Sequence, residues 1–381
     1  MTATDQTSTE QALTERTGTE QGARERTGTE QAVSGLARPE QATSERTVVE
    51  QAATGQSAPA RAQHAAVAVH QRRDHAAAGY EGSHTAGHPR HDPADDSGCR
   101  LPRLWTRTVG DLTLTYVPDA GVHMIPTRVY PASADEDWTE HGTHMTEAGH
   151  LAMGCGALLV ERHGKRLLLD AGHGSISGED PEHFQHGFEH VRTLPDHLER
   201  LGVDPATLET VAFTHLHDDH TGWARPDAVD DDARSLFPHA RWIVGEGELQ
   251  GLAPGSGPRL AGQSERTTAV ADGTEIAEGI RAWALPGHTA GHTAWILDTG
   301  DGRRIVAFGD AMHSPVQIQH PDWEVVLDHD RPQAEASRRR LVEFLSQEGV
   351  YGFGVHFADQ QLGTVDDTGH WRPWNDATDN G

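Results

Sequence analysis

The chain has 381 residues, of which 35% are hydrophobic, and its formal net charge is −27. A chain this acidic repels phosphodiester backbones, so we expect no nucleic-acid partner. Two cysteines, Cys99 and Cys155, are too few for a disulfide framework. The residues after Met1 lack a basic region followed by an apolar core, so we expect no secretory signal and no membrane partner, and we predict a cytoplasmic location.

Residues 1–103 are predicted to be a disordered, low-complexity leader. A Glu-Gln pair recurs every ten residues, at Glu10-Gln11, Glu20-Gln21, Glu30-Gln31, Glu40-Gln41 and Glu50-Gln51. The residues between these pairs are mostly Thr, Gly, Ala and Arg, which bury too little apolar surface to offset the entropy of ordering the chain. A tail that binds a partner or forms a helix is one alternative, and a translation start further downstream is another.

The leader ends in a histidine-rich stretch from His64 to His91. Its histidines are irregularly spaced and no carboxylate or thiol completes a site, which favours a solvated linker over a weak metal-buffering tail. We therefore expect one folded domain, over residues 104–381.

This domain is predicted to alternate strands and helices. Leu112, Leu114 and Tyr116 alternate with polar residues, as in a half-buried strand. Prolines and glycines predict a loop over 118–150. Further strands are expected at 156–160, 166–170, 209–213, 241–244, 279–285, 293–298 and 304–308.

Three helices are predicted between these strands. The first begins after Thr193 and ends before Gly202. A short helix covers 246–252. The last begins at Asp330 and ends at Gly349. The apolar residues on the faces of the first and last helices are Leu194, Leu198 and Leu201, and Ala334, Leu341, Val342 and Leu345.

The segment Thr214–His220 places three histidines and two aspartates directly after the strand predicted at 209–213. Imidazole and carboxylate are the ligands that zinc and similar divalent metals take in hydrolytic sites. The end of a strand is also a usual place for a site on an open α/β sheet. The segment therefore predicts a metal site rather than a histidine-rich surface loop.

The pattern His215-x-His217-x-Asp219-His220 resembles the signature of the metallo-β-lactamase fold superfamily, and the resemblance extends over residues 108–370. Three later segments are similar to the rest of the family's pattern. They are Pro286–His292, in which His288 matches a ligand, Ile305–Asp310, in which Asp310 matches the bridging aspartate, and Phe353–His356, in which His356 matches the last ligand.

The resemblance implies an α/β fold, an αβ/βα four-layer sandwich of two mixed β-sheets flanked by helices. It also implies two divalent metal ions, with zinc as the expected metal and manganese, iron or cobalt as alternatives. One metal would take His215, His217 and His288, and the other Asp219, His220 and His356, while Asp310 and a hydroxide would bridge them. Two cations lower the pKa of a shared water toward about 7, so no side-chain base is needed.

Two further residues of the pattern are expected to have a structural, packing or ligand-supporting role rather than to bind metal. Asp170 lies in a segment that resembles the family's D-x-G turn, where Gly172 would supply a positive φ. His292 is the second histidine of the segment at 286–292. His173 has no counterpart in the family, and we leave it out of the site.

The segment Asp310–Gln317 resembles the branch that contains methyl parathion hydrolase and related lactonases and esterases. In quorum-quenching acyl-homoserine lactonases, a tyrosine three positions after the bridging aspartate assists the substrate's carbonyl oxygen. Here that position is His313, which is either a hydrogen-bond donor or general acid for the substrate or a structural histidine near the sheet edge. This replacement puts acyl-homoserine lactone specificity in doubt but not hydrolysis.

We therefore predict a binuclear metal-dependent hydrolase that uses a metal-bridging hydroxide on a small ester, lactone or similar electrophile, with Asp219 and His313 as catalytic residues. A thioesterase or a phosphotriesterase of the same fold is an alternative, and so is a non-catalytic, metal-stabilised interaction module. No oligomeric state follows from the sequence. Candidates for the pocket wall are Met124, Tyr130, Trp138, Met145 and Trp223, although core burial is the expected fate of each.

Overall fold

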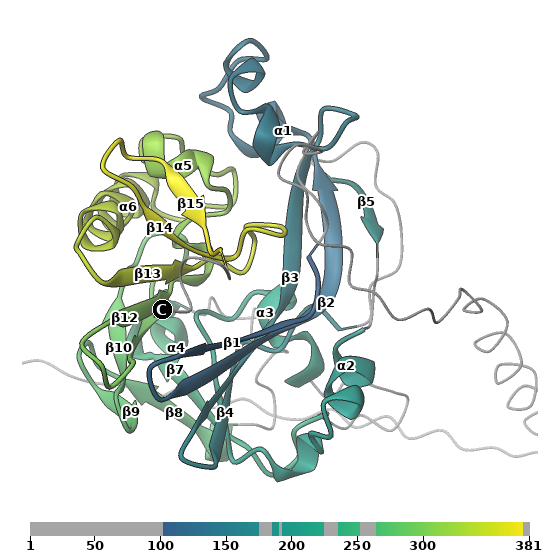
Figure 1. Ribbon diagram of the computed structural model, residues 1–381, viewed down its shortest axis with the longest axis vertical. Coiled ribbons are helices and arrows are strands. Elements are labelled where there is room, and N and C mark those ends of the chain that lie inside the picture. Colours follow the sequence, from purple (N-terminus) through teal and green to yellow (C-terminus); the bar gives the residue numbers. More distant parts are fainter. Residues whose placement is uncertain (1–101, 175–184, 190–192, 225–234, 252–263, 376–381) are drawn as a thin grey trace, which may run out of the picture. The chain divides into compact units, whose positions relative to one another are not determined.

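The computed structural model describes residues 102–174, 185–189, 193–224, 235–251 and 264–375. The Glu-Gln repeats, the histidine-rich stretch and Cys99 lie outside these ranges, so the predicted leader stays a prediction. The described residues form two mixed β-sheets with helices on their outer sides, the predicted α/β four-layer sandwich (Figure 1).

The first sheet has the strand order β1-β2-β3-β4-β6-β7-β8, and β5 pairs with β2. Its strands are β1 (Trp105–Val109), β2 (Leu112–Met124), β3 (Leu151–Arg162), β4 (Lys165–Leu169), β5 (Gln185–Glu189), β6 (Thr210–Ala212), β7 (Arg241–Gly245) and β8 (Thr267–Val270). From β4 to β8 the neighbours are parallel, and the others are antiparallel. The turn between β3 and β4 has positive φ at His163 and Gly164, which suits a tight hairpin.

The second sheet has the strand order β15-β14-β13-β12-β11-β10-β9. Its strands are β9 (Glu275–Ala277), β10 (Ile280–Ala284), β11 (Thr293–Asp298), β12 (Arg304–Ala307), β13 (Val350–Phe353), β14 (Leu362–Val365) and β15 (Trp371–Pro373). Its one parallel pair among the described strands is β12 and β13. These two strands are joined through α6 (Arg331–Leu345), because parallel neighbours need a long crossover.

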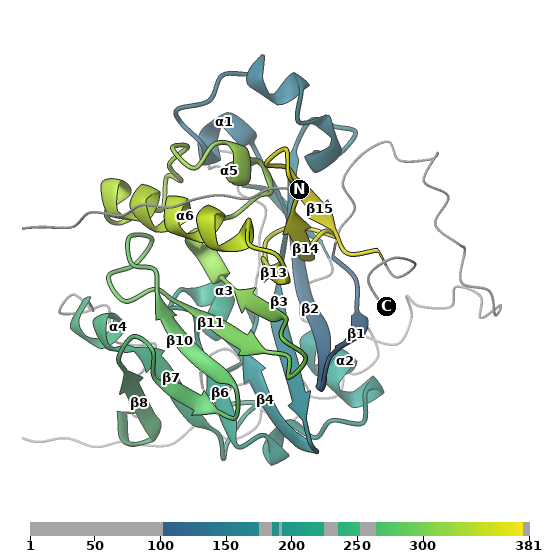
Figure 2. The ribbon, with the colours of Figure 1, turned by 60° about the vertical axis from the view of Figure 1, so that its left-hand side comes forward.

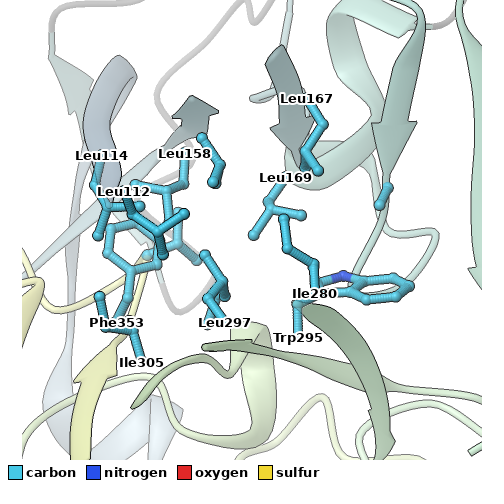
Figure 3. Packing of buried hydrophobic residues seen from close by; sticks show 14 of the residues in the cluster. Leu112, Leu114, Leu158, Leu167, Leu169, Ile280, Trp295, Leu297, Ile305 and Phe353 are labelled. Atoms are coloured by element: carbon cyan, nitrogen blue, oxygen red, sulfur yellow. The ribbon is translucent and has the colours of Figure 1, made fainter. Parts of the chain in front are cut away.

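The central core lies between the two sheets (Figure 3). Leu114, Leu158 and Leu169 of the first sheet contribute to the same buried cluster as Leu297 and Ile305 of the second. Side chains alternate along a strand, so each sheet offers one apolar face to this layer and the other to its helices.

The outer layers are formed by helices on the other face of each sheet (Figure 1). Leu194 and Leu198 of α2 (Leu194–Arg200) pack on the first sheet. Leu341 and Leu345 of α6 pack on the second, and the Asp330 side chain caps this helix by accepting the Gln333 N–H.

The remaining helices are short. The α-helices are α1 (Pro126–Val129), α3 (Asp218–Thr221), α4 (Glu246–Gly251) and α5 (Val316–Gln319). The 3₁₀ turns include η1 (Asp137–Thr139), η2 (Gly142–His144), η3 (Pro205–Thr207), η4 (Gly222–Ala224), η7 (Ser264–Arg266) and η8 (Gly309–Ala311). In Figure 2, α1, α5 and α6 lie together at one end of the sheets. No helix in the described ranges has the length and apolar character needed to cross a bilayer.

The prediction of a loop over 118–150 is wrong for residues 118–124. β2 continues to Met124, whose register partner is Leu151 at the beginning of β3. Pro118 is tolerated inside this strand because the register shifts directly after it, and a bulge does not need the N–H that proline lacks. The strands β1, β5, β8, β9, β14 and β15 were also missed, because they are short and have no distinctive pattern.

Candidate metal centre

The first ligand-bearing segment leaves the first sheet after β6. His215 and His217 follow this strand, and His217 is the N-cap of α3, with the extended angles φ −72° and ψ 163°. The His217 carbonyl accepts the N–H groups of His220 and Thr221, which closes the single helical turn that carries Asp219 and His220. The residues after β6 and this turn together present four side chains over six positions of sequence.

The structure gathers the seven predicted ligands into two groups. The first group is His215, His217, His288 and Asp310, and the second is Asp219, His220, Asp310 and His356. Within each group the ligand atoms lie within 4.8 Å of one another. Each group draws residues from both sheets, because His288 lies between β10 and β11, Asp310 follows β12 and His356 follows β13.

Asp310 belongs to both groups because its two oxygens face different histidines. Oδ2 lies 3.2 Å from His288 Nε2 and 3.6 Å from His215 Nε2. Oδ1 lies 3.0 Å from His220 Nε2 and 2.9 Å from His356 Nε2. The backbone of Asp310 is fixed in η8, where its N–H donates to Nε2 of His292 at 3.0 Å.

The residues present fit two cations. Nε2 of His215, Nε2 of His220 and Oδ1 of Asp310 are buried and make no hydrogen bond within the described part of the chain. These three atoms lie close together, but their geometry does not suit hydrogen bonds between them. Such an arrangement is expected when their lone pairs point at cations rather than at one another. Orphaned buried polar atoms are costly unless something satisfies them, and imidazole and carboxylate are the donors that zinc takes.

The other ring nitrogen of most of these histidines is held by the protein, which leaves Nε2 free to ligate. The partners of Nδ1 are Thr214 Oγ1 for His215 (3.1 Å), Asp170 for His220 (2.9 Å), Asp328 for His288 (3.2 Å) and the Gly154 carbonyl for His356 (2.6 Å). His217 differs, because its Nδ1 lies 3.0 Å from His288 Nε2 and so faces into the first group.

Asp170 is in neither group, and its carboxylate contacts His220 of the second group. Its carboxylate also accepts the N–H of Thr214 at 2.8 Å. The residue has φ 60°, which is uncommon for a residue other than glycine. Gly172, two positions on, has the expected positive φ.

Asp328 and Arg338 were not found from the sequence. Asp328 Oδ1 faces His288 Nδ1, and its Oδ2 lies 2.9 Å from Arg338 Nη1 in a buried ion pair. Burial raises the pKa of Asp328, but hydrogen bonding to His288 and the charge of Arg338 outweigh it and lower the pKa to about 2. One signal existed: Arg338 lies on the predicted apolar face of α6, between Ala334 and Leu341, where a charge needs a partner.

The titratable groups of the centre are strongly perturbed in the absence of metal. Burial lowers the pKa of His217 to about 4. Burial also lowers the pKa of His288, but the Asp310 and Asp328 carboxylates outweigh it and raise this pKa to about 9. For Asp219, the neighbouring His220 and His356 overcome burial and lower the pKa to about 2. The carboxylates are therefore ionised and attract positive charge.

His313 lies beside the two groups without belonging to either. Its Nε2 is 3.1 Å from Asp310 Oδ2, and its ring stacks on His356 at a centroid distance of 5.3 Å. Its backbone N–H donates to Gln317 Oε1 at 2.7 Å. Burial lowers the pKa of His313 despite the Asp310 charge, so the imidazole is neutral at neutral pH.

Within the described ranges, the open side of the centre is formed by Asp219 and His217. The Asp219 side chain is 27% exposed and His217 is half-buried, whereas the other five ligands are buried. Among the seven predicted ligands, these two are therefore the ones that solvent reaches in the described part of the chain.

Several candidates for the pocket wall belong to the core instead. Tyr130 and Trp138 are buried and pack with Trp323 at ring-centroid distances of 6.1 and 5.4 Å. Trp223 is buried and donates from Nε1 to Asp119 Oδ1 at 2.8 Å. Met124 is also buried, and Met145 is half-buried.

Comparisons with known proteins agree with this geometry. A sequence model of the metallo-beta-lactamase superfamily matches residues 152–349. The "Probable metallo-hydrolase" of Mycobacterium tuberculosis is 28% identical over 229 residues, which cover 51% of this chain and 70% of that protein. The hydroxyacylglutathione hydrolase of Cupriavidus taiwanensis is 34% identical over 114 residues, or 29% of this chain and 39% of that protein. The solved structure of AidC, a dizinc quorum-quenching lactonase, shares the fold, with a TM-score of 0.61, 21% identity and coverage of 74% of this chain and 99% of that one.

Proposed function

Because this chain belongs to the metallo-beta-lactamase superfamily, we propose that it is a hydrolase that depends on two divalent metal ions and cleaves a small ester, lactone or similar electrophile. The position of Asp310 carries this proposal, since one carboxylate with an oxygen toward each ligand group suits a pair of cations better than a single one.

The proposed ligands of one cation are His215, His217 and His288, those of the other are Asp219, His220 and His356, and Asp310 is common to both. When bound, such cations lower the pKa of water toward about 7 and act as Lewis acids on a carbonyl or phosphoryl oxygen. Zinc suits this donor set, and manganese, iron and cobalt are the alternatives.

The protein's own contribution is to hold the reacting groups in place. Asp219 is the exposed ligand, and we assign it the role of orienting the attacking water from the open side. His313 is assigned the role of donating a hydrogen bond to the substrate oxygen. Its lowered pKa makes it a neutral donor rather than a cationic acid. Gln317 holds its backbone N–H, and its ring stacks on His356.

A thioesterase is the second candidate, supported by the similarity to hydroxyacylglutathione hydrolase over 114 residues. Thioesters present the same carbonyl electrophile to the same donor set. A phosphotriesterase and a non-catalytic interaction module are the remaining alternatives, and the module would bind metal without turnover.

The test is a substrate panel on the metal-loaded protein. We expect two equivalents of metal by elemental analysis and chelator-sensitive hydrolysis of at least one lactone or carboxylic ester. Turnover of thioesters alone would favour the second candidate. Two bound metals without hydrolysis of any lactone, ester, thioester or phosphotriester would favour the interaction module.

A further inference from the structure

Glu248 on α4 is a buried carboxylate that contacts both ligand-bearing loops without being a ligand. Its side chain accepts three hydrogen bonds. Oε2 accepts the N–H of Leu216 at 3.1 Å, and Oε1 accepts the N–H of Gly291 at 3.1 Å and the hydroxyl of Thr289. The residue is 5% exposed, so these donors replace the water that it loses on burial.

The three donors lie next to ligands in the sequence. Leu216 stands between His215 and His217, and Thr289 follows His288. One carboxylate therefore joins the loop after β6 to the turn between β10 and β11. Those two segments supply every histidine of the first ligand group.

Close backbone packing fixes how deeply Glu248 enters between the two segments. A Cβ on Gly247 would come within 2.6 Å of the Ala290 carbonyl oxygen and 2.7 Å of the Gly291 Cα. A Cβ on Gly291 would overlap the backbone nitrogen of Glu248. Glycine at both positions lets α4 contact the turn backbone to backbone, which leaves Glu248 little freedom to move.

The second ligand group is supported by different residues. Asp170 holds His220, and the Gly154 carbonyl holds His356. None of the hydrogen bonds found for Glu248 in the described chain reaches either of these histidines or Asp219. Loss of the Glu248 carboxylate should therefore disturb the geometry of the first ligand group more than that of the second.

We propose that Glu248 is a positioning residue that sets the spacing of His215, His217 and His288, and with it the affinity of the first group for its cation. The inference rests on the proposed function, because it presumes that the first group binds metal. A glutamine in this place can accept at only one of its two terminal atoms. Its NH₂ group would then face a backbone N–H or a hydroxyl donor, and one segment would lose its anchor.

The experiment is calorimetric titration of zinc into the metal-free full-length protein, for wild type and Glu248→Gln. The matched control is Glu246→Gln, an exposed glutamate two positions earlier in the same helix. We expect Glu248→Gln to weaken one of two zinc sites by about 10–100-fold, as is usual for the loss of a partner outside the ligand set, and to leave the other unchanged. The control should keep both wild-type sites.

A second variant, Thr289→Val, removes one hydrogen-bond donor and keeps the Glu248 carboxylate. It tests the positioning role of Glu248 if Glu248→Gln does not fold. It should weaken the same single site by a smaller factor. Two wild-type affinities in a folded Glu248→Gln or Thr289→Val protein would overturn the positioning role alone. Equal weakening of both sites would overturn it as well. Failure of the wild type to bind zinc would instead overturn the proposed function, and this inference with it.

Discussion

Asp170 Oδ2 lies 2.9 Å from Nδ1 of His220, on the opposite ring edge from the Nε2 that faces Asp310. The same carboxylate group accepts the Thr214 N–H, so it holds both the start of the ligand loop and one of its histidines. These contacts explain why Asp170 keeps a left-handed φ of 60°, a conformation that persists only where the surroundings impose it.

Replacing Asp170 with asparagine should weaken the second ligand group selectively. Asparagine tolerates a positive φ, so the fold should survive, but the charge that orients His220 is lost. We expect the affinity of one zinc site to fall by about 10–100-fold, measured by calorimetric titration. The control is Asp322→Asn at an exposed aspartate. Unchanged affinity at both sites in Asp170→Asn would contradict the assignment.

His217→Ala and Asp219→Ala should each abolish turnover. Both remove a proposed ligand from the open side of the centre, so we expect kcat/KM to fall by more than about 100-fold, the upper range for partners outside the ligand set. Initial rates and metal content should be measured together. The matched control is His239→Ala, an exposed histidine outside the centre. Near-wild-type rates in Asp219→Ala under metal-limited conditions would disprove its role.

Metal binding should release protons at neutral pH. The pKa of His288, raised to about 9, means that this ring is protonated in the metal-free protein and must lose its proton to ligate. Zinc affinity should therefore increase as the pH rises toward about 9. The same shift stabilises the metal-free fold below the unfolded-state pKa of about 6.5, and this contribution is lost as the pH rises through about 9.

Titrations in two buffers of different ionisation enthalpy give the number of protons released. Thermal unfolding of the metal-free protein across the same range tests the sign of the stability change. Affinity that is constant or falls over this range would show that His288 is neutral before metal binds.

Leu297→Ala should destabilise the domain without altering the metal centre directly. Leu297 is fully buried between the two sheets, and truncation leaves a cavity that costs about 2–5 kcal/mol. Denaturant unfolding should show a lower midpoint with an unchanged slope. Leu327→Ala is the comparison, because this side chain is 44% exposed and should cost less than about 0.5 kcal/mol.

Deleting residues 1–100 should leave turnover unchanged. The first described strand begins at Trp105, and every proposed ligand lies at or beyond His215. Steady-state kinetics of the shortened and full-length proteins, each loaded with the same metal, provide the measurement. A large fall in kcat would show that the leader takes part in catalysis.

The fold class and the grouping of the seven residues could be predicted because four short motifs resemble the pattern of a known superfamily. His215, His217, Asp219 and His220 lie within six positions of sequence, and each later residue follows a strand. The residues that hold the ligands in place were harder to predict, because Asp328 and Glu248 act through contacts between segments that are distant in sequence. The full length of β2 was missed because Pro118 suggested a loop, and only the register with β3 shows that a bulge accommodates it.

Both ligand groups take side chains from segments that follow strands of each of the two sheets, so a bound cation would also link one sheet to the other. A ligand that binds only when both halves are docked stabilises the docked state by RT ln(1 + [L]/Kd). In a cell short of zinc, the supply of metal would then govern how much of this protein survives proteolysis as well as how fast each copy works.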